Sequence, residues 1–324
     1  MFRILILFLL IFPVWSWTEE QIMVFRSFVD MYDLDYGTQE EFNYRLGVFY
    51  DNLRYINWIK NENASGPEYG LNQFTAMTSE EFQQILVPVT FDLAKFNDEI
   101  PKINFGEFFR KKRENPPESF DYRDYGWVSP VKDQKSCGGS WAFVSSALLE
   151  SINLRYYQVL LDTSEQWLID CNPRNSGCQG GWLDYGIDFI QKYGIPPESE
   201  YPYTGTDSNN TCSNSCGIYH KNIIYTLIES ETDIEYCIYN YGPVGFFFKV
   251  PKAFQFYTGG TFDVENCDQD VSGLHEATVV GYTPEYWIVK NSWGEYWGDN
   301  GYVYYKRNKN LCGIEKQLIA TYKL

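Results

Sequence analysis

The chain has 324 residues, of which 44% are hydrophobic and 19% aromatic, and it carries a formal net charge of −17. Acidity of this size disfavours nucleic acids and anionic membranes as partners, because both are polyanions. The length suffices for one large or two ordinary domains, and the aromatic content supplies material for cores and for clefts that grip peptides.

The N-terminus predicts a cleavable signal peptide. Arg3 supplies a positive charge, residues 4–12 form an unbroken apolar run, and Ser16 is a small residue at the usual cleavage spacing. The run is too short to cross a bilayer as a helix, which takes about 20 residues. No later stretch is long and apolar enough to do so. We therefore expect residues 1–16 to be removed and the rest to be secreted.

The front part of the chain is predicted to be helical. Five of its residues follow one another at offsets of four, four, three and four, which places them on one stripe of a helix: Glu41, Arg45, Phe49, Asn52 and Ile56. Glu41 and Arg45 can pair one turn apart, and Phe49 and Ile56 give the stripe an apolar anchor. An ordinary amphipathic helix would show the same spacing. Residues 78–82 then predict a capped helix start.

Residues 88–118 have mixed polarity and are predicted to form a linker. Within them, positions 110–113 hold four consecutive basic residues. Such a run can be a solvated stretch of charge. In a secreted precursor, between two unlike halves, it can equally be a cleavage site for a basic-specific convertase.

The eight cysteines set the back part apart from the front. All of them lie at or after Cys137, and residues 17–113 contain none. In a secreted protein such cysteines predict disulfide bonds. Glycosylation sequons at Asn63 and Asn209 also suit a secreted chain, although sequons alone are weak evidence.

The back part is predicted to hold a helical lobe followed by a β-rich lobe. A helix is expected over residues 140–157, with Leu148, Leu149 and Ile152 among its buried side chains. After about residue 223 the pattern changes to strands separated by glycine-containing turns. The expected strands cover residues 244–250, 277–282, 286–290 and 302–306.

Four blocks in the back part resemble the papain family of cysteine proteases. They are QKSCGGSWAF at 134–143, GCQGG at 177–181, LHEA at 274–277, and KNSWGEYWG at 290–298. Their order matches a nucleophile that is followed after about 130–150 residues by a histidine and an asparagine. The front stripe and residues 70–74 resemble that family's inhibitory propeptide.

The resemblance covers nearly the whole chain after the signal peptide. It implies a papain-like two-lobe α+β fold, with a helical lobe and a β-barrel-like lobe, preceded by a helical inhibitory propeptide. The expected parts are the signal peptide 1–16, the propeptide 17–113 and the peptidase domain 114–324. It also implies a monomer, and a lysosome-like or vacuolar compartment as the alternative to secretion.

In that family a cysteine stands where this chain has Ser140. By the resemblance, His275 is the general base and then the acid, Asn291 orients its ring, and Gln134 completes the oxyanion hole. Trp293 would shield the bond between histidine and asparagine from water. Bare backbone that lines the cleft would come from three glycines: Gly138, Gly180 and Gly181.

Serine at position 140 changes the expected chemistry. A hydroxyl is far less acidic than a thiol, so the thiolate–imidazolium pair of a cysteine protease cannot form. Serine triads use an acid to stabilise the imidazolium, and replacing that acid with asparagine costs about 10⁴ in kcat. We therefore expect loss of peptidase activity. The alternative is slow hydrolysis by Ser140, His275 and Asn291.

A laboratory substitution would be another origin of Ser140. The intact signal peptide and further departures from the family pattern favour a natural chain instead, namely Ala76, Gly139, Leu274 and Glu276. Glu276, next to His275, could pair with the imidazolium or partly block the cleft.

By family position, five residues would line the main specificity pocket: Trp182, Leu183, Phe247, Gly273 and Gln317. Two bulky aromatic side chains there predict a shallow or filled pocket. The alternative is that Trp182 and Phe247 belong simply to the core.

By the same resemblance, three disulfides are expected: Cys137–Cys178, Cys171–Cys212 and Cys267–Cys312. Cys216 and Cys237 are left as candidates for a fourth. A zinc site is disfavoured, because Cys212 and Cys216 have no nearby partner pair and His220 stands alone. Neither a metal nor another cofactor is expected.

Two classes of function follow. The first is a binding protein, whose cleft would hold a peptide or protein ligand, occupy a protease inhibitor, or compete with active relatives for substrate. The second is a weak hydrolase. In either case the chain's own propeptide would plug the cleft while it stays attached, and convertase cleavage after Arg113 would permit maturation in trans.

Overall fold

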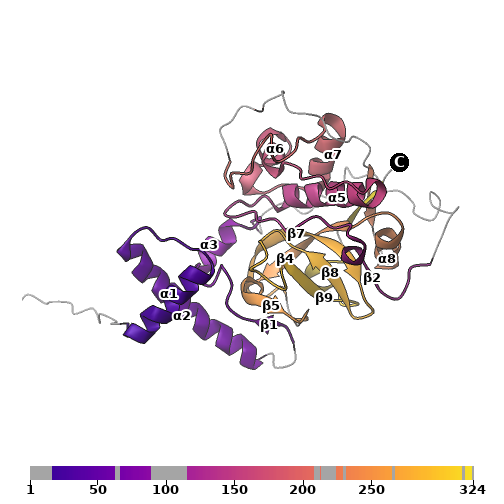
Figure 1. Ribbon diagram of the computed structural model, residues 1–324. Helices are drawn as coiled ribbons and strands as arrows, with labels where there is room; N and C mark the ends of the chain where they lie inside the picture. Colours follow the sequence, from indigo (N-terminus) through magenta and orange to yellow (C-terminus); the bar gives the residue numbers. More distant parts are fainter. Residues whose placement is uncertain are drawn as a thin grey trace, which may run out of the picture.

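The computed structural model describes residues 17–62, 66–88, 115–207, 212, 224–228, 231–264, 267–315 and 318–322. Several predicted features lie outside these ranges: the signal peptide 1–16, the sequons at Asn63 and Asn209, the basic run 110–113, Cys216, His220 and Gln317. Figure 1 shows a helical lobe above a β-rich lobe, with a pair of crossed helices beside them. This arrangement confirms the expected α+β fold with a helical front part.

The crossed helices are α1 (Glu19–Met31) and α2 (Gln39–Glu62). They pack through a small aromatic core that includes Phe25, Phe28 and Phe49. The predicted stripe is confirmed on α2. Glu41 and Arg45 form an ion pair at 2.6 Å, Phe49 and Ile56 are buried, and Asn52 Nδ2 donates to the carbonyl oxygens of residues 75 and 77 at 2.9 Å.

The front part is attached to the β-rich lobe by backbone pairing. Strand β1 (Glu68–Tyr69) runs antiparallel to β5 (Tyr257–Gly259). Helix α3 (Ser79–Gln84) follows, and its start carries the predicted capping box, in which the side chains of Thr78 and Glu81 bond to each other's backbone N–H groups. From the end of α3 the chain enters the space between the lobes.

The helical lobe contains α5 (Ser140–Tyr157), α6 (Glu165–Cys171) and α7 (Leu183–Tyr193). The bounds of α5 are those predicted. Residues 140–153 of this helix are buried on every side, because α5 packs against α6 and α7 and also against β4, β7 and β10. A helix enclosed in this way holds its first residue at the seam of the two lobes.

The β-rich lobe is built on an eight-stranded sheet, in the order β3-β10-β4-β7-β8-β9-β6 with β2 paired to β7. Its strands are β2 (Phe120–Asp121), β3 (Ile224–Ile228), β4 (Val244–Pro251), β6 (Thr261–Phe262), β7 (Val271–Tyr282), β8 (Tyr286–Lys290), β9 (Tyr302–Lys306) and β10 (Leu318–Tyr322). All neighbours are antiparallel except β6 and β9.

The predicted strands are confirmed, with one large difference. Strands β8 and β9 have the predicted bounds, and β4 extends one residue further. Strand β7, expected over 277–282, begins at Val271. Its first half contains Gly273, His275 and Glu276, which break the apolar pattern of a strand but pair with β4 all the same. Helix α8 (Glu231–Asn240), inside the β-rich lobe, was not predicted.

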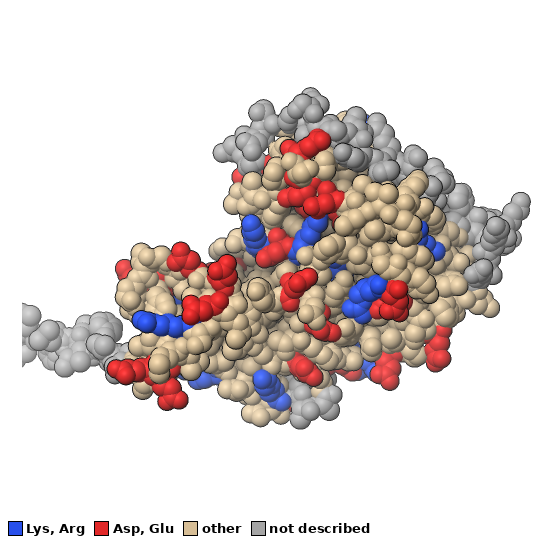
Figure 2. All heavy atoms as spheres, in the orientation of Figure 1, with Lys and Arg blue, Asp and Glu red and all other residues tan. Residues whose placement is uncertain are grey.

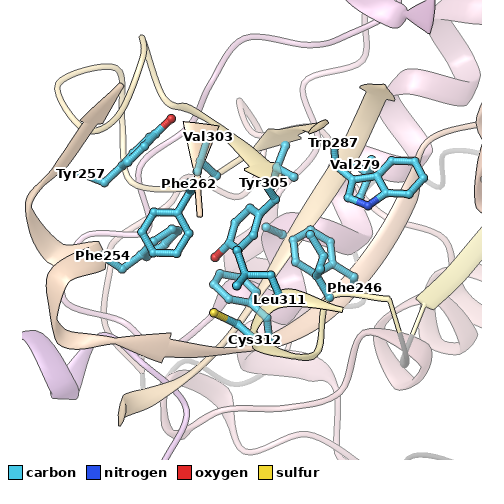
Figure 3. Close-up of a cluster of buried hydrophobic side chains, with 14 of the residues drawn as sticks. Phe246, Phe254, Tyr257, Phe262, Val279, Trp287, Val303, Tyr305, Leu311 and Cys312 are labelled. Atoms are coloured by element: carbon cyan, nitrogen blue, oxygen red, sulfur yellow. The ribbon is translucent and has the colours of Figure 1, made fainter. Parts of the chain in front are cut away.

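The core of the β-rich lobe is largely aromatic. Figure 3 shows Phe254, Phe262 and Tyr305 side by side within it, and the ring centroids of Phe254 and Phe262 are 5.0 Å apart. A second buried cluster fills the helical lobe. Side chains of the front part belong to both clusters, Phe82 to the first and Val87 to the second. The front part is therefore packed into the same core as the lobes that it covers.

The three expected disulfides are present, Cys137–Cys178, Cys171–Cys212 and Cys267–Cys312. Each closes a loop of about 40 residues and should stabilise the fold by about 2–4 kcal/mol. Cys237 is buried, and its suggested partner Cys216 lies outside the described residues, so the fourth bridge stays a prediction.

The surface reflects the acidic composition. In the face seen in Figure 2, acidic side chains are spread over the front helices and both lobes, with basic side chains between them. Within the described ranges, every helix is too short or too polar to cross a membrane.

Candidate active site

Ser140 is the first residue of α5 and lies at the seam between the lobes. Its side chain is buried, and Oγ accepts a hydrogen bond from the backbone N–H of Glu276 at 3.4 Å. The helix N-terminus would favour an anion at this position. A hydroxyl does not ionise there near neutral pH, so the resting site contains no anion at residue 140 for the helix N-terminus to stabilise.

His275 lies on β7, beside Ser140 in the fold. Its Nε2 is 2.7 Å from Oδ1 of Asn291, which follows β8. Because Oδ1 also accepts the N–H of Ser292 at 2.9 Å, it is an acceptor, and Nε2 must carry the ring proton. Nδ1 is then left as the basic nitrogen. Among the described residues, Nδ1 has no hydrogen-bond partner.

Burial lowers the pKa of His275 to about 4, and the hydrogen bond to Asn291 offsets this only in part. The imidazole is therefore neutral above that pH, and forming an imidazolium is costly. Trp293 is fully buried, and its ring lies 4.6 Å from the histidine ring. This position is compatible with the shielding role that the resemblance implies, which stays a prediction.

Gln134 occupies the position expected for an oxyanion-hole donor. Its Nε2 donates to the carbonyl oxygen of Cys137 at 2.8 Å and to that of Ile85 at 2.9 Å. Its Oε1 accepts from the hydroxyl of Ser292 at 2.7 Å, which fixes the orientation of the amide. The carbonyl oxygen of Ile85, in the front part, thus accepts the N–H of Gln134 that a substrate carbonyl would need.

The segment after α3 fills the cleft. Val87 and Leu274 exchange backbone hydrogen bonds of 2.9 and 2.8 Å, so the front part adds a short antiparallel bridge to β7. A Cβ at Gly273 would approach Leu86 Cβ to 2.6 Å, and one at Gly180 would approach Val87 to 3.0 Å. Glycine at these two positions is what allows the segment to lie so close.

The other two cleft glycines differ in their surroundings. A Cβ at Gly138 would lie 3.4 Å from the carbonyl oxygen of Leu86, but its closest contact would be Cys178. A Cβ at Gly181 would collide with Asn175 and Trp141. Close packing inside the helical lobe therefore requires glycine at 181.

Val87 lies near residues that were expected to line the specificity pocket. A Cβ at Gly180 would meet its side chain at 3.0 Å, and it belongs to one buried cluster with Trp182, Leu183 and Phe247. The rings of Trp182 and Phe247 are 5.4 Å apart, so both belong to the core; that they also line a specificity pocket stays a prediction. Nothing in the sequence around Val87 marked it as a residue of the cleft.

Glu276 faces this pocket and not the histidine. Successive side chains of a strand point to opposite faces, so Glu276 lies with Leu274 while His275 points the other way. Its Oε1 accepts the N–H of Leu183 at 3.3 Å. Burial, reinforced by the charge of Asp184, raises the pKa of Glu276 well above its usual range. Burial therefore favours the protonated form of this carboxyl group.

Sequence reasoning missed two further polar residues of the site, Ser292 and Asp184. Ser292 lies within the recognised block, so its hydroxyl could have been considered. Asp184 could not be recognised as a residue of the site, because it is distant from Glu276 in sequence and only the fold brings the two together. Among the residues that the structure describes, no group of three histidine, cysteine or acidic side chains is arranged to hold a metal ion.

Comparisons with known proteins agree with this geometry. Residues 116–322 match the family described as papain family cysteine protease, and residues 25–82 match the cathepsin propeptide inhibitor domain (I29). Cysteine protease XCP2 of Arabidopsis thaliana is 35% identical over 92% of this chain and 85% of its own length. Papain of Carica papaya is also 35% identical, over 92% of this chain and 86% of its own length.

A solved structure extends the likeness to the whole precursor. Digestive procathepsin L2 proteinase from Tenebrio molitor larval midgut superposes with a TM-score of 0.80 at 31% identity, over 93% of this chain and 99% of the other. The match includes the helical front part as well as the two lobes. The chain therefore belongs to the papain family of cysteine proteases and carries a cathepsin-type inhibitory propeptide.

Proposed function

We propose that this protein is a secreted, proteolytically inactive papain-family homologue whose cleft binds an extended peptide or protein segment. The observation that carries the proposal is Ser140 at the position of the nucleophile, beside a histidine whose ring bonds to the neutral amide of Asn291. The cleft itself supports a binding role, because its edge on β7 already pairs with the backbone of Val87.

The chemistry of the site argues against efficient hydrolysis. For Ser140 to attack, His275 must take up its proton and become an imidazolium, and in the precursor, with the front part over the cleft, burial lowers the pKa of His275 to about 4. Asn291 offers a neutral oxygen where serine triads have a carboxylate, and that replacement alone costs about 10⁴ in kcat. Ser140 also begins without a hydrogen bond to the base, since Nδ1 of His275 has no partner among the described residues.

Release of the propeptide would turn the plugged cleft into an open one. Cleavage within the basic run 110–113 by a convertase would allow this without any activity of the chain itself. The open cleft would then capture peptides, occupy protease inhibitors, or compete with active relatives for substrate. The signal peptide and the sequons at Asn63 and Asn209 support secretion as the route, with a vacuole-like compartment as the alternative.

The test compares three full-length precursors: the native chain, Ser140→Cys and Ser140→Ala. Each is secreted, incubated at acidic pH, and assayed for loss of the propeptide on a gel and for cleavage of fluorogenic peptides. We expect Ser140→Cys to process itself and to cleave at least about 10³ times faster than the native chain. The native chain and Ser140→Ala should be indistinguishable.

Hydrolysis by the native chain that disappears in Ser140→Ala would replace this proposal with the alternative, a slow serine-type hydrolase. The unpartnered Nδ1 of His275 is the feature that favours the alternative, since it could accept the hydroxyl proton after the propeptide leaves.

A further inference from the structure

The buried region that Val87 shares with Trp182, Leu183, Phe247 and Leu274 is here called the Val87 pocket. Glu276 stands opposite Phe247 in the pairing of β4 with β7, on the same face of β7 as Leu274. One of its oxygens bonds to the backbone N–H of Leu183. Because Val87 pairs with Leu274 in an antiparallel bridge, the side chains of Val87 and Glu276 extend to the same side of β7.

The second oxygen of this carboxyl group lacks a partner within the part of the chain that the structure describes. Glu276 Oε2 is buried, and among the described residues it has no hydrogen-bond partner. Asp184 Oδ1, close enough to Glu276 to act on its charge, is buried and unsatisfied in the same way. An unpaired buried polar group costs free energy, and Val87 offers it neither a donor nor a charge. Val87 therefore leaves the hydrogen-bonding capacity of these two carboxyl groups unused.

We propose that the Val87 pocket, once the propeptide leaves it, selects a ligand side chain that ends in a cation, lysine or arginine, and that Glu276 is the residue that selects it. The inference rests on the proposed function, because it names the class of peptide that the cleft would take. Valine carries no donor for Oε2, so the matching side chain must carry N–H donors.

Charge decides between a cation and a neutral polar side chain. Burial and the charge of Asp184 favour the protonated form of Glu276 while the occupant is apolar. A neutral amide could satisfy Oε2 but would leave the charge of Asp184 without a counter-charge. An ammonium or guanidinium group would displace the proton of Glu276 and would also offset the charge of Asp184. With two unsatisfied acid oxygens in one place, the cation gains more than any neutral group.

The test is made inside the intact precursor, where the pocket is already filled by residue 87. Four variants are compared: Val87→Lys and Val87→Met, each in the native background and with Glu276→Gln. Methionine matches the length of lysine without its charge, and glutamine matches the shape of Glu276 without its charge. The melting temperature of each secreted precursor is measured.

We expect Val87→Lys to melt at or above the temperature of Val87→Met while Glu276 is present. With Glu276→Gln, Val87→Lys should melt at least about 5 °C below Val87→Met, because a buried ammonium group then lacks a counter-charge. An equal deficit of Val87→Lys in both backgrounds would overturn the proposal, as would secretion of Val87→Met without secretion of Val87→Lys. The melting temperatures do not depend on peptidase activity. The test of the pocket can therefore fail even if the native chain is inactive, and it can succeed even if the native chain is active.

Discussion

Replacing Lys132 with methionine should test the buried ion network beneath the active site. Lys132 Nζ lies 3.0 Å from Glu150, 2.8 Å from Glu165 and 3.0 Å from Asp162, and it donates to the carbonyl oxygen of Thr163 at 3.0 Å. Glu150 and Glu165 are almost completely buried, whereas Asp162 is largely exposed. Removing the lysine therefore affects two carboxyl groups that solvent cannot stabilise.

The magnitude follows from what each carboxyl group retains. Glu150 still has hydrogen bonds from Ser129 and Thr163, and the positive charge of Lys290 acts on it. Glu165 loses its ion pair. Breaking a buried pair by removing one partner costs about 3–5 kcal/mol, so we expect the variant to melt about 10 °C lower at pH 8.

The loss should depend on pH, with a sign that the pKa of Glu165 determines. Burial raises this pKa to about 7, although Lys132 acts to lower it. The folded protein thus holds a proton that the unfolded chain releases above about 4.3, and its stability falls as the pH rises toward 7. Without Lys132 the pKa moves higher still, so the fall continues to higher pH. Lys132→Met should cost less at pH 5 than at pH 8.

Thermal unfolding of the precursor, followed by circular dichroism at both pH values, checks this prediction. The matched control is the double variant Lys132→Met with Glu165→Met, which removes the carboxyl group that the single variant leaves unpaired. It should recover at least half of the lost stability. An equal loss at pH 5 and pH 8, with no recovery in the double variant, would show that Lys132 acts through packing alone.

Two further changes probe the front part and the pocket. Arg45, on α2, forms two parallel bonds to Glu81, on α3, at 2.5 and 2.6 Å, so Arg45→Lys should destabilise the front part by about 1–3 kcal/mol and speed its cleavage in limited proteolysis. Burial raises the pKa of Asp184 from 3.8 to about 7, so the folded protein should lose stability as the pH rises between these values. Asp184→Asn should flatten that decline in melting temperature, and an unchanged slope would exclude Asp184 as its source.

The catalytic elements could be predicted from sequence because short motifs and local structure coincide there. The block around Ser140 contains both the glycines that precede a helix and the helix itself, and α5 has the predicted bounds. The blocks that hold His275 and Asn291 identified the pair that the structure places 2.7 Å apart. Strand β8 was similarly visible, because its apolar run is bounded by turn residues.

The occupancy of the cleft could not be predicted in the same way. Nothing in the sequence around Val87 marks it as a pocket residue, since its neighbours there come from α7, β4 and β7. The side of β7 on which Glu276 lies was also undecided, because the first half of that strand was not recognised. Once the strand is known to begin at Val271, alternation alone places Glu276 and His275 on opposite faces.

Two of the departures from the family pattern, Ser140 and Glu276, meet at β7. The backbone N–H of Glu276 bonds to Ser140, one oxygen of its carboxyl group accepts the N–H of Leu183, and the other has no partner among the described residues. Loss of the thiol would explain a loss of catalysis, but it creates no need for an acid at residue 276. The bond to Leu183 holds the start of α7, yet it uses only one oxygen, and burying the other without a partner lowers the stability of the protein. A structural role therefore accounts for half of this carboxyl group, and recognition of a charged ligand would account for the other half.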